Sequence, residues 1–248
     1  MLSIITPVLN GSFYIESTIC SINKLKIDYE HIIVDGGSTD STLDIIKKYP
    51  NVKLIRQQEK LGMYHAIDLG INIAKGDFIT WVNSDDKIIL YGFEQMYKEI
   101  CKEGIDFVFS NGVHHYINDY SYKTVTALPF ARYFLKEGIF PFVQPSSIFS
   151  KKSYQSVGGF NYQKFKIIGD RDLFQKMAYD SSITMKYVPV LSSVFLRHDE
   201  TLLYRSLDRL EKEHSFTIKT NKSIFIRILY HTFRVIKNEY WNLKIKKI

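Results

Sequence analysis

Two adjacent carboxylates, Asp85 and Asp86, follow an apolar run in the stretch FITWVNSDDKIIL, residues 78–90. Neighbouring carboxylates repel each other, and only Lys87 lies close in sequence, so the pair costs stability unless a cation binds. Oxygen ligands alone favour a hard divalent ion, Mg²⁺ or Mn²⁺, which is usually shared with substrate phosphates. The alternative is an Asp-rich turn after a strand, in which the carboxylates accept local backbone hydrogen bonds. The spacing by itself leaves both interpretations open.

A second acidic position, Asp35, closes the apolar run HIIVD and is followed by GGSTD, residues 36–40. A carboxylate at a strand end can accept a hydrogen bond from a base N–H or from a ribose hydroxyl. The two glycines allow a ligand to approach the backbone closely, and Thr39 or Asp40 can cap a following helix. Any tight strand-to-helix turn has a similar composition, so the glycine turn alone is a weak signal.

The elements that position these residues alternate along the first hundred residues. The runs LSIITPV, HIIVD, VKLIR and DFITWV predict strands, and segments of helical period separate them. Near-continuous apolar strands are typical of a parallel sheet covered on both faces, so the pattern predicts a doubly wound sheet. Ligands bind at the carboxyl ends of such strands. We therefore expect the strand ends at Thr6-Pro7, at Asp35 and at residues 83–86 to meet at one edge.

The second half of the chain has a different pattern. The segments VHHYIN and YKTVTAL, joined by NDYS, predict an antiparallel hairpin, and SSIFS, ITMKYV and VLSSVFL predict further short strands. Neither a Pro/Gly/Ser-rich linker nor an internal repeat is present. One mixed α/β domain over residues 1–215 is therefore favoured over two independent domains.

The ordered set of motifs resembles a known family. The segments LSIITPVLN, YEHIIVDGGSTDST and QQEKLGMYHAIDLGINIAKGDFITWVNSDD match the nucleotide-binding half of the family 2 glycosyltransferases with the GT-A fold. QPSSIFSKKSYQSVGGFN and IIGDRDLFQKM resemble the acceptor half of the same family. The resemblance implies an α/β GT-A fold, with a Rossmann-like, mostly parallel central sheet flanked by helices, a small antiparallel acceptor-side region and a helical C-terminus. It also implies a nucleotide-sugar-binding half at residues 1–110 and an acceptor-binding half at residues 111–215.

Site residues follow from the resemblance position by position. Contacts with the nucleotide-sugar are implied for Thr6, Pro7, Asp35, Lys60, Gly62, Asn83 and Ser84. Asn83-Ser84-Asp85 resembles the DXD motif, in which the last carboxylate, here Asp85, ligates the metal that bridges the two phosphates. Asp86 could add a second ligand and His198 a third, although a surface histidine is an equal interpretation of His198. Asp170 matches the general base of the family.

Four positions depart from the family pattern. Asn83 replaces the first Asp of the metal motif, and Gly36 replaces a frequent second Asp after Asp35. Asp68 stands where Asn is common, and Gly169 stands where Glu often precedes the base. None of these changes removes the implied metal ligand or the implied base, but together they blur the preference for nucleotide and sugar.

The chemistry implied is an inverting, metal-dependent glycosyl transfer of the hexosyl or N-acetylhexosaminyl type. The donor is a nucleotide-sugar, with UDP expected, and the acceptor is a hydroxyl of a glycan or lipid-linked saccharide in surface polysaccharide biosynthesis. A bound Mn²⁺ or Mg²⁺ neutralises charge on the leaving diphosphate, and general-base catalysis contributes roughly 10²–10⁴-fold.

Three alternatives compete with this function. A sugar-phosphate nucleotidyltransferase would need a basic, glycine-rich loop after the first strand, and PVLNGSFYIES contains no Lys or Arg. A glycoside hydrolase could use Asp85 and Asp170 as its carboxylate pair, but it leaves the nucleotide features unexplained. A catalytically silent nucleotide-sugar-binding protein is the third, and the presence of both Asp85 and Asp170 argues against it.

The charge distribution, the N-terminus and the cysteines give the remaining expectations, on partners, location and thiols. The formal charge of +7 belongs to residues 216–248, which hold eight Lys or Arg and one acidic residue. This segment predicts a basic amphipathic helix, which either lies at an anionic membrane surface or packs on the core. Nucleic acid is not an expected partner. The N-terminus lacks the features of a signal peptide, so we expect a cytoplasmic protein, with peripheral binding at the inner face of the plasma membrane as an option. Cys20 and Cys101 are expected to be buried, reduced thiols.

Overall fold

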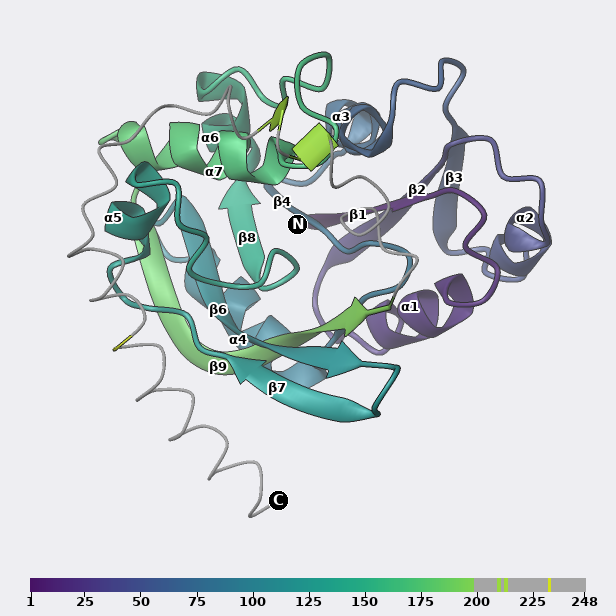
Figure 1. Cartoon of the computed structure of the whole chain (residues 1–248), viewed down its shortest axis with the longest axis horizontal. Helices are drawn as coiled ribbons and strands as arrows, with labels where there is room; N and C mark the ends of the chain where they lie inside the picture. The colour runs from purple at the N-terminus through teal and green to yellow at the C-terminus, as the bar shows by residue number, and fades with distance from the viewer. Residues whose placement is uncertain (199–208, 211, 214–231, 233–248) are drawn as a thin grey trace.

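The protein has a twisted central sheet with helices on both faces (Figure 1). The structure is a computed structural model, and it describes residues 1–198, 209–210, 212–213 and 232. The strands are β1 (Leu2–Val8), β2 (Tyr29–Asp35), β3 (Val52–Arg56), β4 (Phe78–Trp81), β5 (Lys87–Ile88), β6 (Phe107–Tyr116), β7 (Ser121–Val125), β8 (Ser147–Ser150) and β9 (Met185–Arg197). The helices are α1 (Ile15–Ile22), α2 (Thr42–Ile46), α3 (Met63–Ile73), α4 (Leu90–Ile100), α5 (Ala131–Lys136), α6 (Lys151–Ser156) and α7 (Gly169–Tyr179). The predicted C-terminal helix over residues 216–248 lies outside the described residues apart from Thr232, so its membrane association stays a prediction.

The order of the strands is β3-β2-β1-β4-β8-β6-β9-β5, with β7 paired to β6. Strands β3, β2, β1 and β4 run parallel to one another, as the alternating pattern predicted. Val8 pairs with Asp35, and Ile5 pairs with Trp81, so β1, β2 and β4 end at the same edge of the sheet. The convergence of these three strand ends is therefore confirmed.

The second half of the sheet is mixed, because β8 runs antiparallel to β4 and β6 while β9 runs parallel to β6. The predicted hairpin is present as β6 and β7. Two of the predicted boundaries are wrong: ITMKYV and VLSSVFL belong to one strand, β9, and VHHYIN continues the strand that begins at Phe107. The register between β6 and β9 shifts at Ser110–Gly112, opposite Pro189, which has no N–H to give to the ladder. A bulge therefore interrupts the pattern without ending the strands.

Helices α3, α5, α6 and α7 cover one face of the sheet, and α1, α2 and α4 cover the other (Figure 1). In the larger core the ring of Trp81 stacks on Phe174 at a centroid distance of 5.6 Å and meets Phe160 edge-on at 5.4 Å. Trp81 ends β4 and Phe174 lies on α7, so one aromatic cluster fixes the strand that carries the acidic pair to the helix that carries Asp170. Truncating either ring to Ala would cost about 3–5 kcal/mol.

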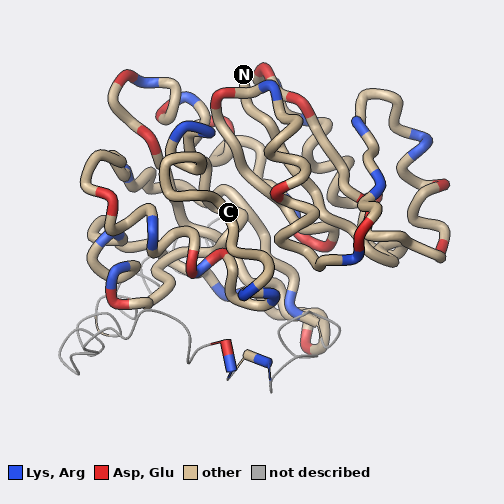
Figure 2. Tube along the Cα trace, turned by 90° about the horizontal axis from the view of Figure 1, so that it is seen from above, with Lys and Arg blue, Asp and Glu red and all other residues tan. Residues whose placement is uncertain are grey.

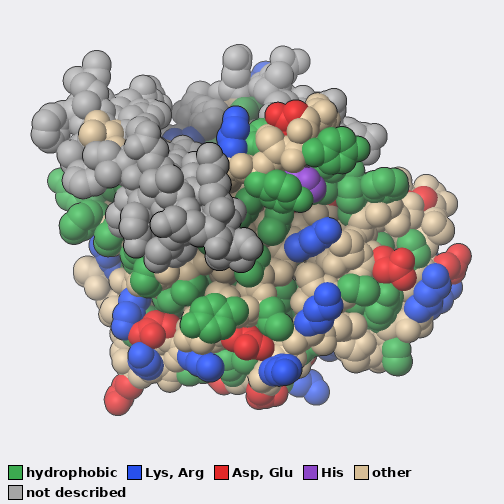
Figure 3. All heavy atoms as spheres, turned by 90° about the horizontal axis from the view of Figure 1, so that it is seen from below, with side chains coloured by type: hydrophobic (Ala, Val, Ile, Leu, Met, Phe, Trp, Pro, Cys, Tyr) green, Lys and Arg blue, Asp and Glu red, His purple; other side chains and the backbone are tan. Residues whose placement is uncertain are grey.

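The surface of the described part mixes both signs of charge. Figure 2 shows acidic and basic residues interspersed along the trace, and Figure 3 shows apolar, basic and acidic side chains side by side on one face.

The prediction of buried thiols was wrong, because Cys20 and Cys101 are free but exposed. Cys20 follows the buried Ile19 and so lies on the outer side of α1. Among the helices of the described ranges, none is long and apolar enough to cross a bilayer.

Candidate active site

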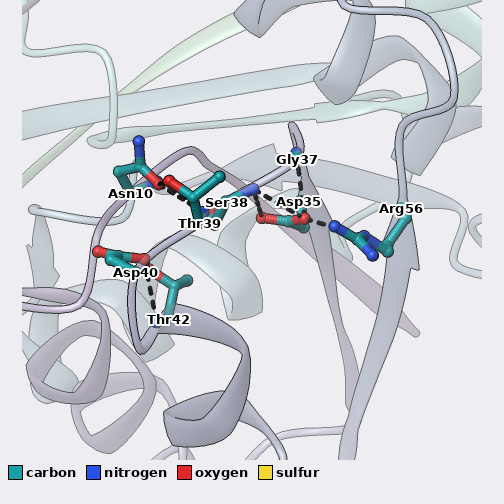
Figure 4. A network of polar contacts seen from close by, with 8 residues as sticks. All are labelled: Asn10, Asp35, Gly37, Ser38, Thr39, Asp40, Thr42 and Arg56. Atoms are coloured by element: carbon teal, nitrogen blue, oxygen red, sulfur yellow. Dashed lines mark hydrogen bonds and ion pairs between the residues drawn. The ribbon is translucent and has the colours of Figure 1, made fainter.

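The loops that follow β1 and β2 are joined by small polar side chains at the carboxyl edge of the sheet (Figure 4). The Asn10 N–H donates to Ser38 Oγ at 2.8 Å, and the Thr39 N–H donates to Asn10 Oδ1 at 2.8 Å. The Gly11 N–H donates to Thr42 Oγ1 at 2.9 Å. Asn10 has a φ of 51°, a left-handed conformation that asparagine tolerates better than most residues. The two loops therefore form one continuous rim.

Asp35 lies within this rim and is fully buried. Its carboxylate accepts hydrogen bonds from the Gly37 N–H at 3.1 Å and from the Ser38 N–H at 3.0 Å. Arg56 at the end of β3 forms an ion pair with it, with Nε 3.4 Å from Oδ2 (Figure 4). The Arg56 side chain is 62% exposed. Arg56, which the sequence did not single out, is thus an exposed cation beside the buried carboxylate of Asp35.

Thr6 and Pro7 are buried in the last part of β1. The Thr6 hydroxyl lies 3.0 Å from His31 Nε2, and burial lowers the pKa of His31 to about 3, so its ring is neutral. The side chain of Thr6 thus points into the fold. Exposed chain begins at Leu9, which is 60% exposed, so β1 meets solvent beyond the two residues implied by the family pattern.

Lys60 and Gly62 are exposed on the loop between β3 and α3. A Cβ atom added at Gly37 would lie 3.2 Å from Lys60 Cε, so the end of the lysine side chain reaches over the turn that holds Asp35. Gly62 precedes α3 with a φ of 100°, a conformation that favours glycine. The structure therefore brings Lys60 to the same edge as Asp35.

The residues that follow β4 are fixed by contacts from distant parts of the chain. The Thr18 hydroxyl on α1 lies 2.8 Å from the carbonyl oxygens of Ser84 and Asp86. His198 Nε2 lies 2.9 Å from Asp85 Oδ2, although the two residues are 113 positions apart. The Asp85 side chain is 23% exposed. The fold thus brings together two of the residues considered as metal ligands.

Asp86 faces the interior instead. It is 1% exposed, and it accepts hydrogen bonds from the Leu196 N–H at 3.0 Å and from Asn83 Nδ2 at 3.2 Å. Burial and the neighbouring Asp85 raise its pKa well above the ordinary range. Its contacts join the end of β4 to β9, which gives Asp86 a structural role that the sequence did not separate from metal binding.

The residues around Asp85 fit a divalent ion that is shared with phosphates. Asn83 Oδ1 and His198 Nδ1 are buried and have no hydrogen-bond partner among the residues that the structure describes. Asn83 comes two residues before Asp85, and His198 is hydrogen-bonded to it. Within the described ranges, no three His, Cys, Asp or Glu side chains are grouped closely enough to hold a metal ion by themselves. Mg²⁺ in proteins is typically held by one or two carboxylates together with substrate phosphates, and this donor set meets that description.

Asp170 is the second residue of α7 and is half-buried. Its Oδ1 accepts hydrogen bonds from the Tyr64 hydroxyl at 3.0 Å and from the Arg171 N–H at 2.8 Å. Burial raises the pKa of Asp170, and these hydrogen bonds offset part of the effect. Tyr64 lies in the first turn of α3, two residues after Gly62. The candidate base is therefore joined to the helix that follows the loop of Lys60.

Tyr64 and Glu213 are two further residues that the sequence did not indicate. A Cβ atom at Gly169 would lie 2.6 Å from Tyr64 Cδ2, so the glycine that replaces the family's Glu leaves room for this ring. A signal for Tyr64 existed, because a buried tyrosine hydroxyl usually needs a hydrogen-bond partner. The Glu213 carboxylate accepts hydrogen bonds from the backbone N–H groups of residues 166–168, just before α7. Nothing in the sequence around Glu213 predicted these contacts.

Comparison with known proteins identifies similar chains. The model of Glycosyl transferase family 2 matches residues 3–168. Glycosyltransferase GlyG of Streptococcus pneumoniae is 32% identical over 119 residues, which are 45% of this chain and 38% of GlyG. A PGL/p-HBAD biosynthesis glycosyltransferase of Mycobacterium tuberculosis is 36% identical over 93 residues, 36% of each chain. The matched regions thus span less than two-fifths of these relatives.

Two solved structures share the fold. S. aureus TarS 1-349 in complex with UDP-GlcNAc aligns with a TM-score of 0.65 and 16% identity, over 90% of this chain and 68% of that one. The mannosyltransferase PcManGT from Pyrobaculum calidifontis, in complex with GDP-Man and Mn²⁺, aligns with a TM-score of 0.65 and 17% identity, over 89% of this chain and 65% of that one. The GT-A fold expected from the motifs is confirmed. Because the family model covers most of its length, the chain belongs to glycosyl transferase family 2.

Proposed function

We propose that the protein transfers a sugar from a nucleotide-sugar, with UDP as the expected nucleotide, to a hydroxyl of a glycan or lipid-linked acceptor, with inversion and with a divalent metal. The observation that carries the proposal is the pairing of Asp85 with His198 beside the unpartnered Asn83 Oδ1, at the edge that also holds Asp35. The fold-related TarS and PcManGT chains, which were solved with UDP-GlcNAc and with GDP-Man and Mn²⁺, support a donor of this class.

Donor binding is assigned to the rim of the sheet edge. Lys60 and Arg56 are exposed cations that flank the turn of residues 36–38, and a nucleoside diphosphate carries the opposite charge. Asp35 keeps that turn in shape by accepting its N–H groups. We assign the base and ribose to this side of the edge, and the diphosphate to the side of Lys60 and Asp85.

Metal binding is assigned to Asp85, with His198 as its neighbour and Asn83 Oδ1 as a further oxygen. A bound Mn²⁺ or Mg²⁺ would stabilise the negative charge that grows on the departing diphosphate. Asp86 is not assigned as a ligand, because hydrogen bonds from Leu196 and Asn83 engage its two oxygens inside the fold.

Proton transfer is assigned to Asp170. The acceptor hydroxyl oxygen attacks the anomeric carbon, the bond from that carbon to the diphosphate oxygen breaks, and Asp170 takes the hydroxyl proton. Attack opposite the leaving group inverts the configuration. A pKa raised by burial brings the carboxylate closer to the working pH, which makes it a better base, and general-base catalysis contributes roughly 10²–10⁴-fold.

The test is a panel of UDP-, GDP- and dTDP-sugars, each with Mn²⁺, with Mg²⁺ or with EDTA. Thermal shift reports donor binding, and release of nucleoside diphosphate in the presence and absence of saccharide acceptors reports turnover. We expect one donor class to stabilise the protein more strongly with metal and to be consumed. A silent binding protein would be stabilised without releasing nucleotide, and a nucleotidyltransferase would release nucleoside triphosphate from pyrophosphate and the sugar nucleotide.

Three variants assign the roles. Asp85→Asn should lose the metal-dependent part of the stabilisation, and Asp170→Asn should keep donor binding and lose turnover. Asp172→Asn is the matched control, since this carboxylate lies on the same helix and pairs with Lys176 at 3.1 Å. Normal turnover by Asp170→Asn would show that the base has been assigned wrongly.

A further inference from the structure

The hydroxyl of Tyr64 sits between the candidate base and the backbone in front of it. It lies 3.0 Å from Asp170 Oδ1 and 3.0 Å from the carbonyl oxygen of Ile167. We propose that Tyr64 is the positioning residue of Asp170, holding Oδ1 so that Oδ2 is presented to the acceptor hydroxyl. The inference rests on the proposed function, in which Asp170 is the base.

The ring of Tyr64 has little freedom to move. It is 2% exposed, it lies 5.0 Å from the ring of Phe160, and the missing side chain at Gly169 leaves the space that it fills. An alanine at position 169 would place Cβ 2.6 Å from the ring. The hydroxyl is therefore held at one place relative to the first turn of α7.

The hydroxyl has one hydrogen and two acceptors at the same distance. An ionised carboxylate attracts it more strongly than the carbonyl of Ile167, because hydrogen bonds to charged acceptors are the stronger ones. Once Asp170 has taken a proton, the carbonyl becomes a competitive acceptor. Tyr64 thus favours the ionised, proton-accepting form of Asp170. Since the Arg171 N–H also donates to Oδ1, we assign Oδ2 as the oxygen that takes the proton.

Tyr64 also connects the base to the donor side of the site. It follows Gly62 by two residues. A second contact joins the same two parts of the chain, because Lys166 Nζ, in the loop before α7, donates to the carbonyl oxygen of Leu61 in the loop before α3. The loop that carries Lys60 and the loop that precedes Asp170 are therefore joined at two points. Removing only the hydroxyl of Tyr64 leaves the ring and the lysine contact in place.

Among the described residues, the charged and titratable groups that act most strongly on Asp170 are Tyr64 on α3 and Arg171 on α7, and Glu213 acts on Tyr64. Burial raises the pKa of Asp170, and the hydrogen bond from Tyr64 lowers it. Loss of the hydroxyl should therefore move the titration of Asp170 to higher pH.

The experiment compares Tyr64→Phe with Tyr154→Phe. Tyr154 is the matched control, because its buried hydroxyl donates to another carboxylate, Asp68 Oδ1 at 2.6 Å, and its ring also contacts Phe160, at 5.6 Å. In Tyr64→Phe we expect kcat to fall about tenfold, as the loss of one charge-assisted hydrogen bond implies. The donor KM should stay unchanged, and the acidic limb of the pH profile should move to higher pH. Tyr154→Phe should change neither.

Unchanged kcat and an unchanged acidic limb in Tyr64→Phe would overturn the inference, as would an equal loss in Tyr154→Phe. A second readout does not need activity: the Asp170 carboxyl carbon is followed by NMR in protein labelled with ¹³C at aspartate Cγ, its signal assigned with Asp170→Asn. Titration at higher pH in Tyr64→Phe supports the inference, and titration at the wild-type pH contradicts it. If the wild type transfers no sugar, the proposed function fails and the carboxyl titration still decides the role of Tyr64.

Discussion

Glu213 offers a sharp test of how the described residues 209–210 and 212–213 support the site. Its carboxylate is 2% exposed and faces three consecutive backbone N–H groups directly before α7. Oε2 accepts from Ile167 at 2.9 Å and from Ile168 at 3.1 Å, while Oε1 accepts from Lys166 at 2.8 Å and from Arg209 Nε at 3.0 Å. The change Glu213→Gln keeps the shape and replaces one of these oxygens with an amide NH₂.

The magnitude follows from the bonds that glutamine cannot make. Its remaining oxygen is best placed on the two N–H groups of Ile167 and Ile168, which leaves an NH₂ group facing the Lys166 N–H. One lost hydrogen bond to a charged acceptor costs roughly 1.5–3 kcal/mol. The Arg209 pair adds less than about 1 kcal/mol, because the arginine is 52% exposed. We expect the local stability to fall by about 2–3 kcal/mol, which corresponds to a roughly 30–150-fold larger equilibrium constant for local opening.

Hydrogen exchange is the direct assay. In Glu213→Gln the amides of residues 166–168 should exchange faster by about that factor, while the amide of Ile32 in β2 should keep its wild-type rate. Glu99→Gln is the control, since Glu99 pairs with Lys102 and Lys186 at the surface and should not affect residues 166–168. Equal exchange in wild type and Glu213→Gln would refute the support assigned to this segment.

The same contact predicts a dependence on pH. Burial alone would raise the pKa of Glu213, but the hydrogen bonds from the backbone N–H groups and Arg209 outweigh it, so the pKa lies below the ordinary 4.5. The contribution of Glu213 is therefore complete above the pKa of the unfolded chain and is lost as the pH falls through the folded value. The difference between wild type and Glu213→Gln should shrink toward acid pH.

Two further predictions concern packing and the metal. Gly92→Ala would place Cβ 1.9 Å from the carbonyl oxygen of Leu191, so urea unfolding should show a loss of more than about 2 kcal/mol; a loss below 0.5 kcal/mol would mean that α4 shifts freely against β9. His198→Gln removes the imidazole that lies 2.9 Å from Asp85 Oδ2. Calorimetry should then show UDP binding weakened about tenfold with Mn²⁺ and unchanged with EDTA, since loss of a group beside a metal ligand typically costs 10–100-fold. If His198→Gln bound UDP as tightly as the wild type in the presence of Mn²⁺, His198 would have no part in the metal site.

The sequence predicted the frame of the site because local patterns determine it. Four apolar runs separated by helical segments are sufficient to place the ends of β1, β2 and β4 at one edge. Asp35 ends one of these runs, and Asp85 follows another after a short polar turn. The orientation of individual carboxylates is a different matter. Asp85 and Asp86 are adjacent and chemically identical, and only the pairing of the chain with β9 turns Asp86 inward.

The contacts that the sequence could not predict join residues far apart in the chain. Tyr64 and Asp170 are separated by 106 positions, and Glu213 reaches the loop before α7 across 45 to 47 positions. Such contacts depend on how α3 and α7 pack on the same face of the sheet. The bulge opposite Pro189 was missed for a similar reason, because one long strand with a bulge gives the same sequence pattern as two short strands. Gly169 was visible as a departure from the family, and its meaning appeared only with the ring of Tyr64 beside it.

The central claim is that Asp85 holds a divalent ion that in turn binds the donor diphosphate. A crystal grown with UDP and Mn²⁺ and measured at the manganese absorption edge tests it most directly. We predict an anomalous peak at coordination distance from the Asp85 carboxylate and from both phosphates, with the uracil on the side of Asp35. A diphosphate bound at this edge with no manganese beside Asp85, or a manganese ion bound elsewhere, would contradict the claim.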